Sequence, residues 1–152
     1  MKIILDAMGG DHAPKAPVLG ALAADKQYEI VLVGDSDAIW EILKEQGHTT
    51  LPENISVVHT TEVVDMHDDP ANVVRQKKGA SMMVALKMLA DGDGDACISA
   101  GSTGALLSGA TLIVKRVKGI RRAAMGPVMP NKAGGKTVIL DCGANAECPA
   151  EF

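Results

Sequence analysis

The fold of this chain is set by the segment Asp95-Ala-Cys-Ile-Ser-Ala-Gly-Ser-Thr-Gly-Ala-Leu-Leu107. Its residues 96–100 form a short apolar run, which predicts a buried strand. Residues 101–104, Gly-Ser-Thr-Gly, predict a turn, and residues 105–117 predict a helix because apolar side chains recur there at helical spacing. A strand, a tight turn and a helix N-terminus in succession are typical of an anion-binding site.

Two properties of this segment favour phosphate as the anion. The first N–H groups of a helix have no partner inside it, and the helix dipole is positive at that end. Gly101 and Gly104 have no Cβ, so a ligand could approach the backbone closely, while Ser102 and Thr103 add hydroxyl donors. The alternative is a tight turn with a Ser or Thr helix cap, because the segment is neither a P-loop nor a G-x-G-x-x-G fingerprint.

Composition restricts the class of protein. The 152 residues are enough for one domain, and 47% are hydrophobic although Phe, Trp and Tyr occur once each. Such a core of Val, Ile, Leu, Met and Ala is typical of parallel α/β folds. The net charge of −4 argues against general nucleic-acid binding. Three cysteines without C-x-x-C spacing suit a reducing cytosol and indicate neither a zinc site nor a disulfide framework.

Strands and helices are predicted to alternate along the chain. Strands are expected over residues 2–5, 29–33, 55–59, 96–100, 123–129 and 136–140. Helices are expected over residues 15–26, 37–46, 71–90 (as one helix or a pair broken near Gly79) and 105–117, with Asp35 and Asp69 at two N-termini. This alternation predicts one α/β domain over residues 1–152, with a doubly wound, mostly parallel sheet and helices on both faces in three α/β/α layers. The sheet would have an unfinished edge, which indicates the N-terminal portion of a longer protein.

Three unusual loops are expected at the carboxyl ends of the strands, where such sheets bind ligands. They span residues 6–14, 100–105 and 141–145. Their coincidence at one edge predicts a binding site there.

The string Asp6-Ala-Met-Gly-Gly-Asp-His-Ala-Pro14 resembles the opening of the PlsX family, the bacterial phosphate acyltransferases (acyl-ACP:phosphate acyltransferases) of phospholipid synthesis. The likeness runs the whole length of the chain and includes residues 31–35, 66–82, 96–105 and 141–145. Ser102 stands where the family usually has Asn, and Gln76 stands where Arg is usual.

The resemblance implies that inorganic phosphate attacks the thioester of a long-chain acyl group on acyl carrier protein, giving acyl phosphate and free carrier. It further implies no metal or organic cofactor, a homodimer, and a downstream glycerol-3-phosphate acyltransferase that uses the product. The implied location is the cytoplasm, with loose attachment to the inner face of the cell membrane.

Phosphate is an adequate nucleophile when it is held and aimed, so this chemistry needs mainly anion donors and positioning. The candidate catalytic residues are His12, which could orient phosphate or carry its proton, and Lys78, which could add charge. Their alternatives are a loop histidine bonded to local backbone and a solvated helix face. The candidate phosphate- or substrate-binding residues are Gly9, Gly10, Asp11, Lys77, Gly101, Ser102, Thr103, Gly104 and Asn145. Asn145 could instead cap a helix, and Asp6 and Asp141 are expected to shape the loops.

The cysteines do not favour an acyl-cysteine intermediate. Cys97 lies within a predicted strand, where a thiol is expected to be buried and inert, and Cys142 is placed as a packing residue at a strand end. Direct attack by phosphate is therefore the favoured mechanism.

The predicted central helix ends in a basic run of Lys115, Arg116, Lys118, Arg121 and Arg122. Cations are favourable at a helix C-terminus. The alternative is a docking patch for the acidic acyl carrier protein or for anionic lipid headgroups.

Three competing functions remain at this point. A phosphotransacetylase-like enzyme that uses acyl-CoA shares the loop chemistry. A dinucleotide-binding dehydrogenase is disfavoured because the first strand is not followed by G-x-G-x-x-G. The third is a non-catalytic phosphate-sensing or scaffold domain.

Overall fold

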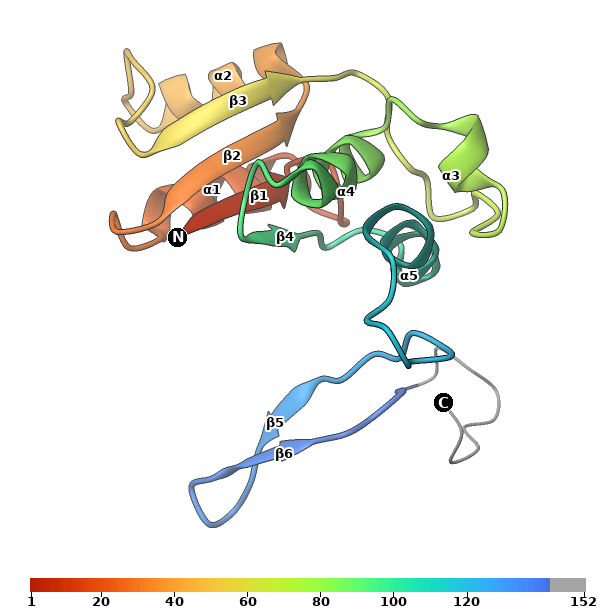
Figure 1. Cartoon of the computed structure of the whole chain (residues 1–152). Helices are drawn as coiled ribbons and strands as arrows, with labels where there is room; N and C mark the ends of the chain where they lie inside the picture. Colours follow the sequence, from red (N-terminus) through yellow and green to blue (C-terminus); the bar gives the residue numbers. More distant parts are fainter. Residues whose placement is uncertain (143–152) are drawn as a thin grey trace. The chain divides into compact units, whose positions relative to one another are not determined.

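The computed structural model describes residues 1–142, and the chain divides into two compact units (Figure 1). The first unit is Met1–Val114 and the second begins at Lys115. Within residues 1–142, no helix combines the length and the apolar character needed to cross a bilayer.

The first unit alternates strands with helices. Its strands are β1 (Lys2–Asp6), β2 (Glu29–Gly34), β3 (Ile55–His59) and β4 (Ala96–Ile98). Its helices are α1 (Lys15–Ala23), α2 (Ser36–Glu45), α3 (Val73–Gln76), α4 (Ser81–Asp91), α5 (Thr103–Gly109) and the π-helical turn η1 (Ala110–Val114). These elements confirm the α/β fold class.

The four strands form one parallel sheet in the order β3-β2-β1-β4. The chain runs outward from β1 through β2 to β3 and then crosses to β4, on the opposite side of β1. The strand order therefore reverses between β1 and β4. Sheets of this kind bind ligands in the crevice beyond the carboxyl ends of the two strands at such a reversal.

Strand β2 shows how the sheet is buried on both faces. Because side chains alternate along a strand, Ile30 and Leu32 join the core formed with α1 and α2. Val31 and Val33 face the other way and pack with Ile4 and with Ala85 of α4. Figure 1 shows α4 on one side of the sheet and α1 and α2 on the other. The predicted arrangement of helices on both faces is therefore confirmed.

Helix ends follow local capping chemistry. Asp35 is the N-cap of α2, as predicted, and its Oδ1 accepts hydrogen bonds from the Asp37 nitrogen at 2.9 Å and the Ala38 nitrogen at 3.4 Å. Asp69 does not cap a helix, since Asn72 precedes α3 and Asp69 Oδ1 instead accepts from the Ala71 nitrogen in the turn before it. The break between α3 and α4 includes Gly79, as the sequence predicted.

Several predicted boundaries are wrong by a few residues. Helix α1 ends at Ala23 rather than at residue 26, and β4 ends at Ile98 rather than at residue 100. The helix after β4 begins at Thr103 and ends at Val114, because Lys115 adopts a left-handed conformation with φ +74°.

The sequence predicts that the last two strands extend the parallel sheet, and this prediction is wrong. β5 (Val128–Pro130) and β6 (Lys136–Val138) pair with each other, antiparallel, in a separate two-stranded sheet. Asp141 thus follows a strand of this pair, and the loop at residues 141–145 does not follow a strand of the parallel sheet. Residues 143–145, including Asn145, lie outside the described residues.

Candidate active site

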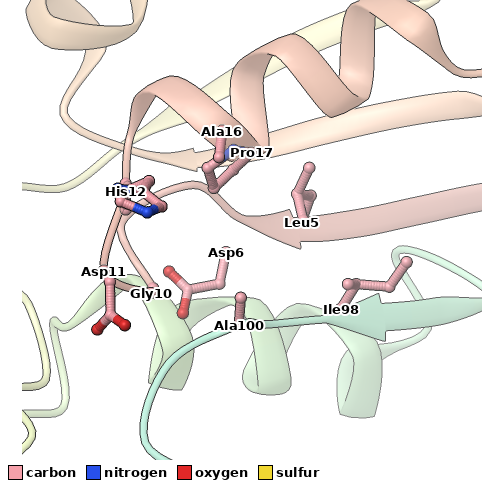
Figure 2. A pocket seen from close by; sticks show the side chains of 11 residues that line it. Leu5, Asp6, Gly10, Asp11, His12, Ala16, Pro17, Ile98 and Ala100 are labelled. Carbon is pink, nitrogen blue, oxygen red and sulfur yellow. The ribbon is translucent and has the colours of Figure 1, made fainter.

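A cavity of about 450 Å³ lies where β1 and β4 end, at the reversal of the strand order (Figure 2). Its walls come from the end of β1, the loop that follows it, the start of α1 and the end of β4. The lining residues are Leu5, Asp6, Gly9, Gly10, Asp11, His12, Ala13, Ala16, Pro17, Ile98 and Ala100. The loops after β1 and β4, which the sequence predicted at one edge of the sheet, therefore do meet there.

A chain of hydrogen bonds joins these two loops. Asp6 is 1% exposed, and its Oδ2 accepts from Ser99 Oγ at 2.6 Å, while Oδ1 accepts from the Met8 nitrogen at 3.2 Å. Ser99 Oγ in turn accepts from the Gly101 nitrogen at 3.1 Å. Asp6 and Ser99 meet because Leu5 and Ile98 are paired in the parallel register, so the next residue of each strand lies opposite the other. These contacts support the loop-shaping role expected of Asp6.

Gly9 and Gly10 allow the first loop to lie directly on the second. A Cβ at Gly9 would be 2.5 Å from Asp6 Oδ2, 2.8 Å from Ser99 Oγ and 2.9 Å from the Gly101 nitrogen. Gly10 has a backbone φ of +105°, which residues other than glycine rarely adopt. A Cβ there would be 3.1 Å from the carbonyl oxygen of Ala100. No other residue type fits either position without a shift of the surrounding backbone.

Asp11 and His12 are exposed side chains at the mouth of the cavity. The carbonyl oxygen of His12 accepts from the Ala16 nitrogen at 2.9 Å, so its backbone is fixed at the start of α1. Figure 2 shows the His12 ring on the α1 side of the cavity and the Asp6 carboxylate between the two loops. An exposed imidazole in this place can reach a ligand without breaking a protein contact.

The turn between β4 and α5 is capped by its own serine. Ser102 is 7% exposed, and its Oγ accepts from the Ala105 nitrogen at 3.4 Å. The space beside both turn glycines is filled by protein: a Cβ at Gly101 would be 2.9 Å from Met82 Cε, and one at Gly104 would be 2.8 Å from Pro70 Cγ. The sequence predicts that a ligand occupies this space, but protein side chains fill it, so packing explains the two glycines. Thr103 is the exposed residue of the turn.

The two candidate lysines lie apart from His12. Lys77 Nζ donates to Asp68 Oδ2 at 2.6 Å and to the carbonyl oxygen of Val63 at 3.0 Å. This bond to Lys77 lowers the pKa of the Asp68 carboxyl, so the ion pair is lost only as the pH falls through that lowered pKa. Lys77 thus anchors the segment before α3. Lys78 is exposed and lines a second cavity, between α3, α4 and η1.

Cys97 lies on β4, close to the hydrogen-bonded chain. Burial, and then the negative charge of Asp6, raises the pKa of its thiol from 9.0 to about 11. A thiol that stays protonated at neutral pH is a poor nucleophile, which agrees with direct attack by phosphate. Cys142 is exposed. Among residues 1–142, no group of three His, Cys, Asp or Glu side chains is placed to hold a metal ion.

Ser99 is the residue of this site that the sequence did not reveal. It was assigned to the strand, although it bridges Asp6 and the Gly101 nitrogen. A polar residue that directly follows a short apolar run, when a neighbouring strand ends in Asp, is the signal that could have identified it.

Comparison with known proteins supports the resemblance seen in the loops. The family model described as fatty acid synthesis protein matches residues 1–152. Phosphate acyltransferases from Clostridioides difficile (strain 630), Bacillus mycoides (strain KBAB4) and Listeria innocua serovar 6a are 46%, 49% and 47% identical to the chain. The matches cover 97%, 97% and 99% of this chain and 44% of each relative, so the chain spans less than half the length of these curated relatives. The chain belongs to the fatty acid synthesis protein family, which is the PlsX family that its loops resemble.

Proposed function

We propose that this chain provides the phosphate-binding part of a phosphate acyltransferase, with phosphate held in the cavity at the ends of β1 and β4. The observation that carries the proposal is the junction of the two loops there: Gly9 lies on Gly101, and Ser99 links Asp6 to the Gly101 nitrogen. The names of the relatives supply the reaction class.

Phosphate would be bound mainly by backbone N–H groups and by His12. The proposed backbone donors are the N–H groups of Gly9, Gly10 and Asp11, residues that line the cavity. The Asp6 carboxylate would repel an anion, but its oxygens already accept hydrogen bonds from Ser99 and from the Met8 nitrogen. In the proposal, Asp6 therefore holds the two loops together and does not contact phosphate.

In the proposed reaction, a phosphate oxygen attacks the carbonyl carbon of an acyl thioester. The C–S bond then breaks, the acyl group remains on phosphate, and the proton that phosphate loses is transferred to the leaving thiolate. His12, at the mouth of the cavity, accepts that proton and returns it to sulfur. The N–H groups of the loop after β1, at Gly9 and Gly10, stabilise the negative oxygen that forms on the thioester carbonyl.

The proposed acyl donor is acyl carrier protein, and the proposed product serves phospholipid synthesis. The exposed basic residues Lys115, Arg116 and Lys118 support an acidic partner, because opposite charges steer such an encounter. Reversing the charges of Lys115, Arg116 and Lys118 should raise KM for the carrier substrate and leave kcat unchanged. An unchanged KM would remove this docking patch. A homodimer, cytoplasmic location and contact with the inner membrane face are part of the same proposal.

The test is to incubate the chain with acyl carrier thioester and inorganic phosphate, and to trap acyl phosphate with hydroxylamine. We expect hydroxamate only when both substrates are present, with less product when acyl-CoA replaces the carrier thioester. Equal or faster turnover of acyl-CoA would favour the phosphotransacetylase-like alternative. Phosphate binding without product from either donor, repeated with the chain extended to the length of its relatives, would favour a non-catalytic phosphate-binding domain.

A further inference from the structure

The first unit contains a second cavity, of about 400 Å³, on the α4 side of the sheet. It is formed by α3, α4 and η1 and shares no lining residue with the cavity at the strand ends. Its lining residues are Val74, Arg75, Lys78, Met83, Lys87, Leu112 and Ile113. Small-molecule sites typically measure roughly 300–1,000 Å³, so the volume is sufficient for a small ligand.

The walls of this second cavity are apolar. Met83 is 2% exposed and closes the inner end, while Leu112 is 56% exposed and so presents apolar surface to the solvent. Leu112 and Ile113 belong to the single π-helical turn η1. Such turns are rare and occur often at functional sites.

Close packing of α5 on α4 brings this turn to the cavity. A Cβ at Gly109 would be 2.5 Å from Leu86 Cδ1 and 3.2 Å from Met83 Sδ, so a larger residue would displace these two side chains. The apolar wall is therefore a consequence of how the two helices pack and does not depend on a mobile loop.

The rim of the second cavity is positively charged. Its three charged lining residues are all basic, in a chain whose net charge is −4. Lys87 Nζ is 2.7 Å from Asp91 Oδ2, one turn along α4. Arg75 and Lys78 are exposed, and within residues 1–142 neither forms an ion pair. Two uncompensated cations beside an apolar hollow complement a ligand that is anionic at one end and apolar along its length.

We propose that this second cavity binds a single-chain amphiphile with an anionic headgroup. The alkyl chain contacts Met83, Leu112 and Ile113, and the phosphate or carboxylate head lies at Arg75 and Lys78. A protein partner fits less well, because stable protein interfaces bury about 800 Å² on each side and are not confined to a single hollow. This inference does not depend on the proposed reaction, because the two cavities share no residue.

The test is a titration of the isotope-labelled chain, with the probes below their micellar concentrations. Dodecyl phosphate and laurate carry the two candidate headgroups, dodecyltrimethylammonium has the same chain with a positive head, and inorganic phosphate has no chain. We expect saturable shifts of the Met83 methyl group and of the Leu112 and Ile113 amides with the two anionic amphiphiles only. The tighter of the two probes identifies the headgroup as phosphate or carboxylate.

Two sets of variants separate the charge from the apolar wall. The double variant Arg75→Glu, Lys78→Glu should weaken dodecyl phosphate by about tenfold or more, as expected for two exposed charges. Leu112→Gln, at an exposed position, should also weaken it, whereas Lys26→Glu, in the turn after α1, should leave the affinity unchanged. Equal binding of the cationic amphiphile, unchanged affinity in the double variant, or shifts confined to the cavity at the strand ends would each overturn the proposal. An acidic peptide that displaces no probe supports it, and one that competes at lower concentration than the amphiphiles overturns it.

Discussion

The two cavities of the first unit would hold an anion in different ways. The cavity at the strand ends is built from backbone that glycine allows to pack closely, with Asp6 buried in its wall. The second cavity lies between helices and presents exposed cations, Arg75 and Lys78, beside apolar side chains. If a site is formed by closely packed backbone, an added methyl group should abolish ligand binding. If a site is formed by side-chain charge, reversal of that charge should abolish ligand binding.

Gly9→Ala should have the largest effect on the cavity at the strand ends. The new methyl group would lie 2.5 Å from Asp6 Oδ2 and 2.9 Å from the Gly101 nitrogen, so the two loops must separate. We expect phosphate binding and acyl phosphate formation to be lost, and stability to fall by about 1–3 kcal/mol, as for other overpacked sites. Calorimetry and the hydroxamate assay measure both.

Gly20→Ala is the matched control for this variant. Gly20 lies in α1 and no atom comes within 4 Å of a Cβ there. Stability should be unchanged or rise by up to about 1 kcal/mol, because alanine is the better helix former. Full activity in Gly9→Ala would refute the idea that close loop packing forms the site.

His12→Gln tests the chemistry of the same cavity without changing its shape. If His12 carries the proton from phosphate to sulfur, kcat should fall by roughly 100-fold, at the lower end of general acid–base effects, with a smaller change in KM for phosphate. His48→Gln, in the loop after α2, should have normal kinetics. A normal kcat in His12→Gln would leave His12 with no part in proton transfer.

Gly109→Ala tests whether the second cavity can be changed without affecting the cavity at the strand ends. The added methyl group would lie 2.5 Å from Leu86 Cδ1 and 3.2 Å from Met83 Sδ, so these two side chains must move and the wall of the second cavity changes. We expect a loss of about 1–3 kcal/mol in stability and weaker binding of dodecyl phosphate. Phosphate-induced shifts at Gly9 and Gly10 should persist. Loss of those shifts in a folded variant would show that the two cavities are coupled.

Alkylation of the cysteines tests the electrostatics near Asp6. With a pKa of about 11, the Cys97 thiol is almost fully protonated at about pH 9. Iodoacetamide should therefore modify the exposed Cys142 more than about ten times faster than Cys97, as measured by peptide mapping. Equal rates in the folded chain would contradict the raised pKa, and equal rates in urea are the expected control.

The same raised pKa has a consequence for stability. Folding holds the Cys97 proton more tightly than the unfolded chain does, so this group's contribution is present below about pH 9 and is lost as the pH rises toward 11.

Local sequence was sufficient to predict four strands of the parallel sheet and the edge at which the loops after β1 and β4 meet. Short apolar runs, separated by segments of helical spacing, identified β1 to β4. Asp35 was recognised as a helix cap because capping depends only on the next three residues. The meeting of the loops after β1 and β4 followed from the rule that parallel strands end at one edge.

Contacts distant in sequence explain what could not be predicted. Ser99 leaves β4 because it bonds Asp6, a residue 93 positions away, and Lys77 binds Asp68 instead of facing solvent. The space beside Gly104 is filled by Pro70, which no local pattern indicates. The apolar run of β6 also does not determine which strand it pairs with. β6 pairs with β5 and does not join the parallel sheet.

A phosphate titration followed through backbone amide shifts will show whether the cavity at the ends of β1 and β4 binds phosphate, with sulfate in parallel as the control for ionic strength. We predict saturable shifts, specific for phosphate, at Gly9 to His12 and, through its contact with Gly9, at Gly101, and their disappearance in Gly9→Ala. Phosphate that shifts only Arg75 and Lys78, or no amide in either loop, would contradict a phosphate site at the ends of β1 and β4.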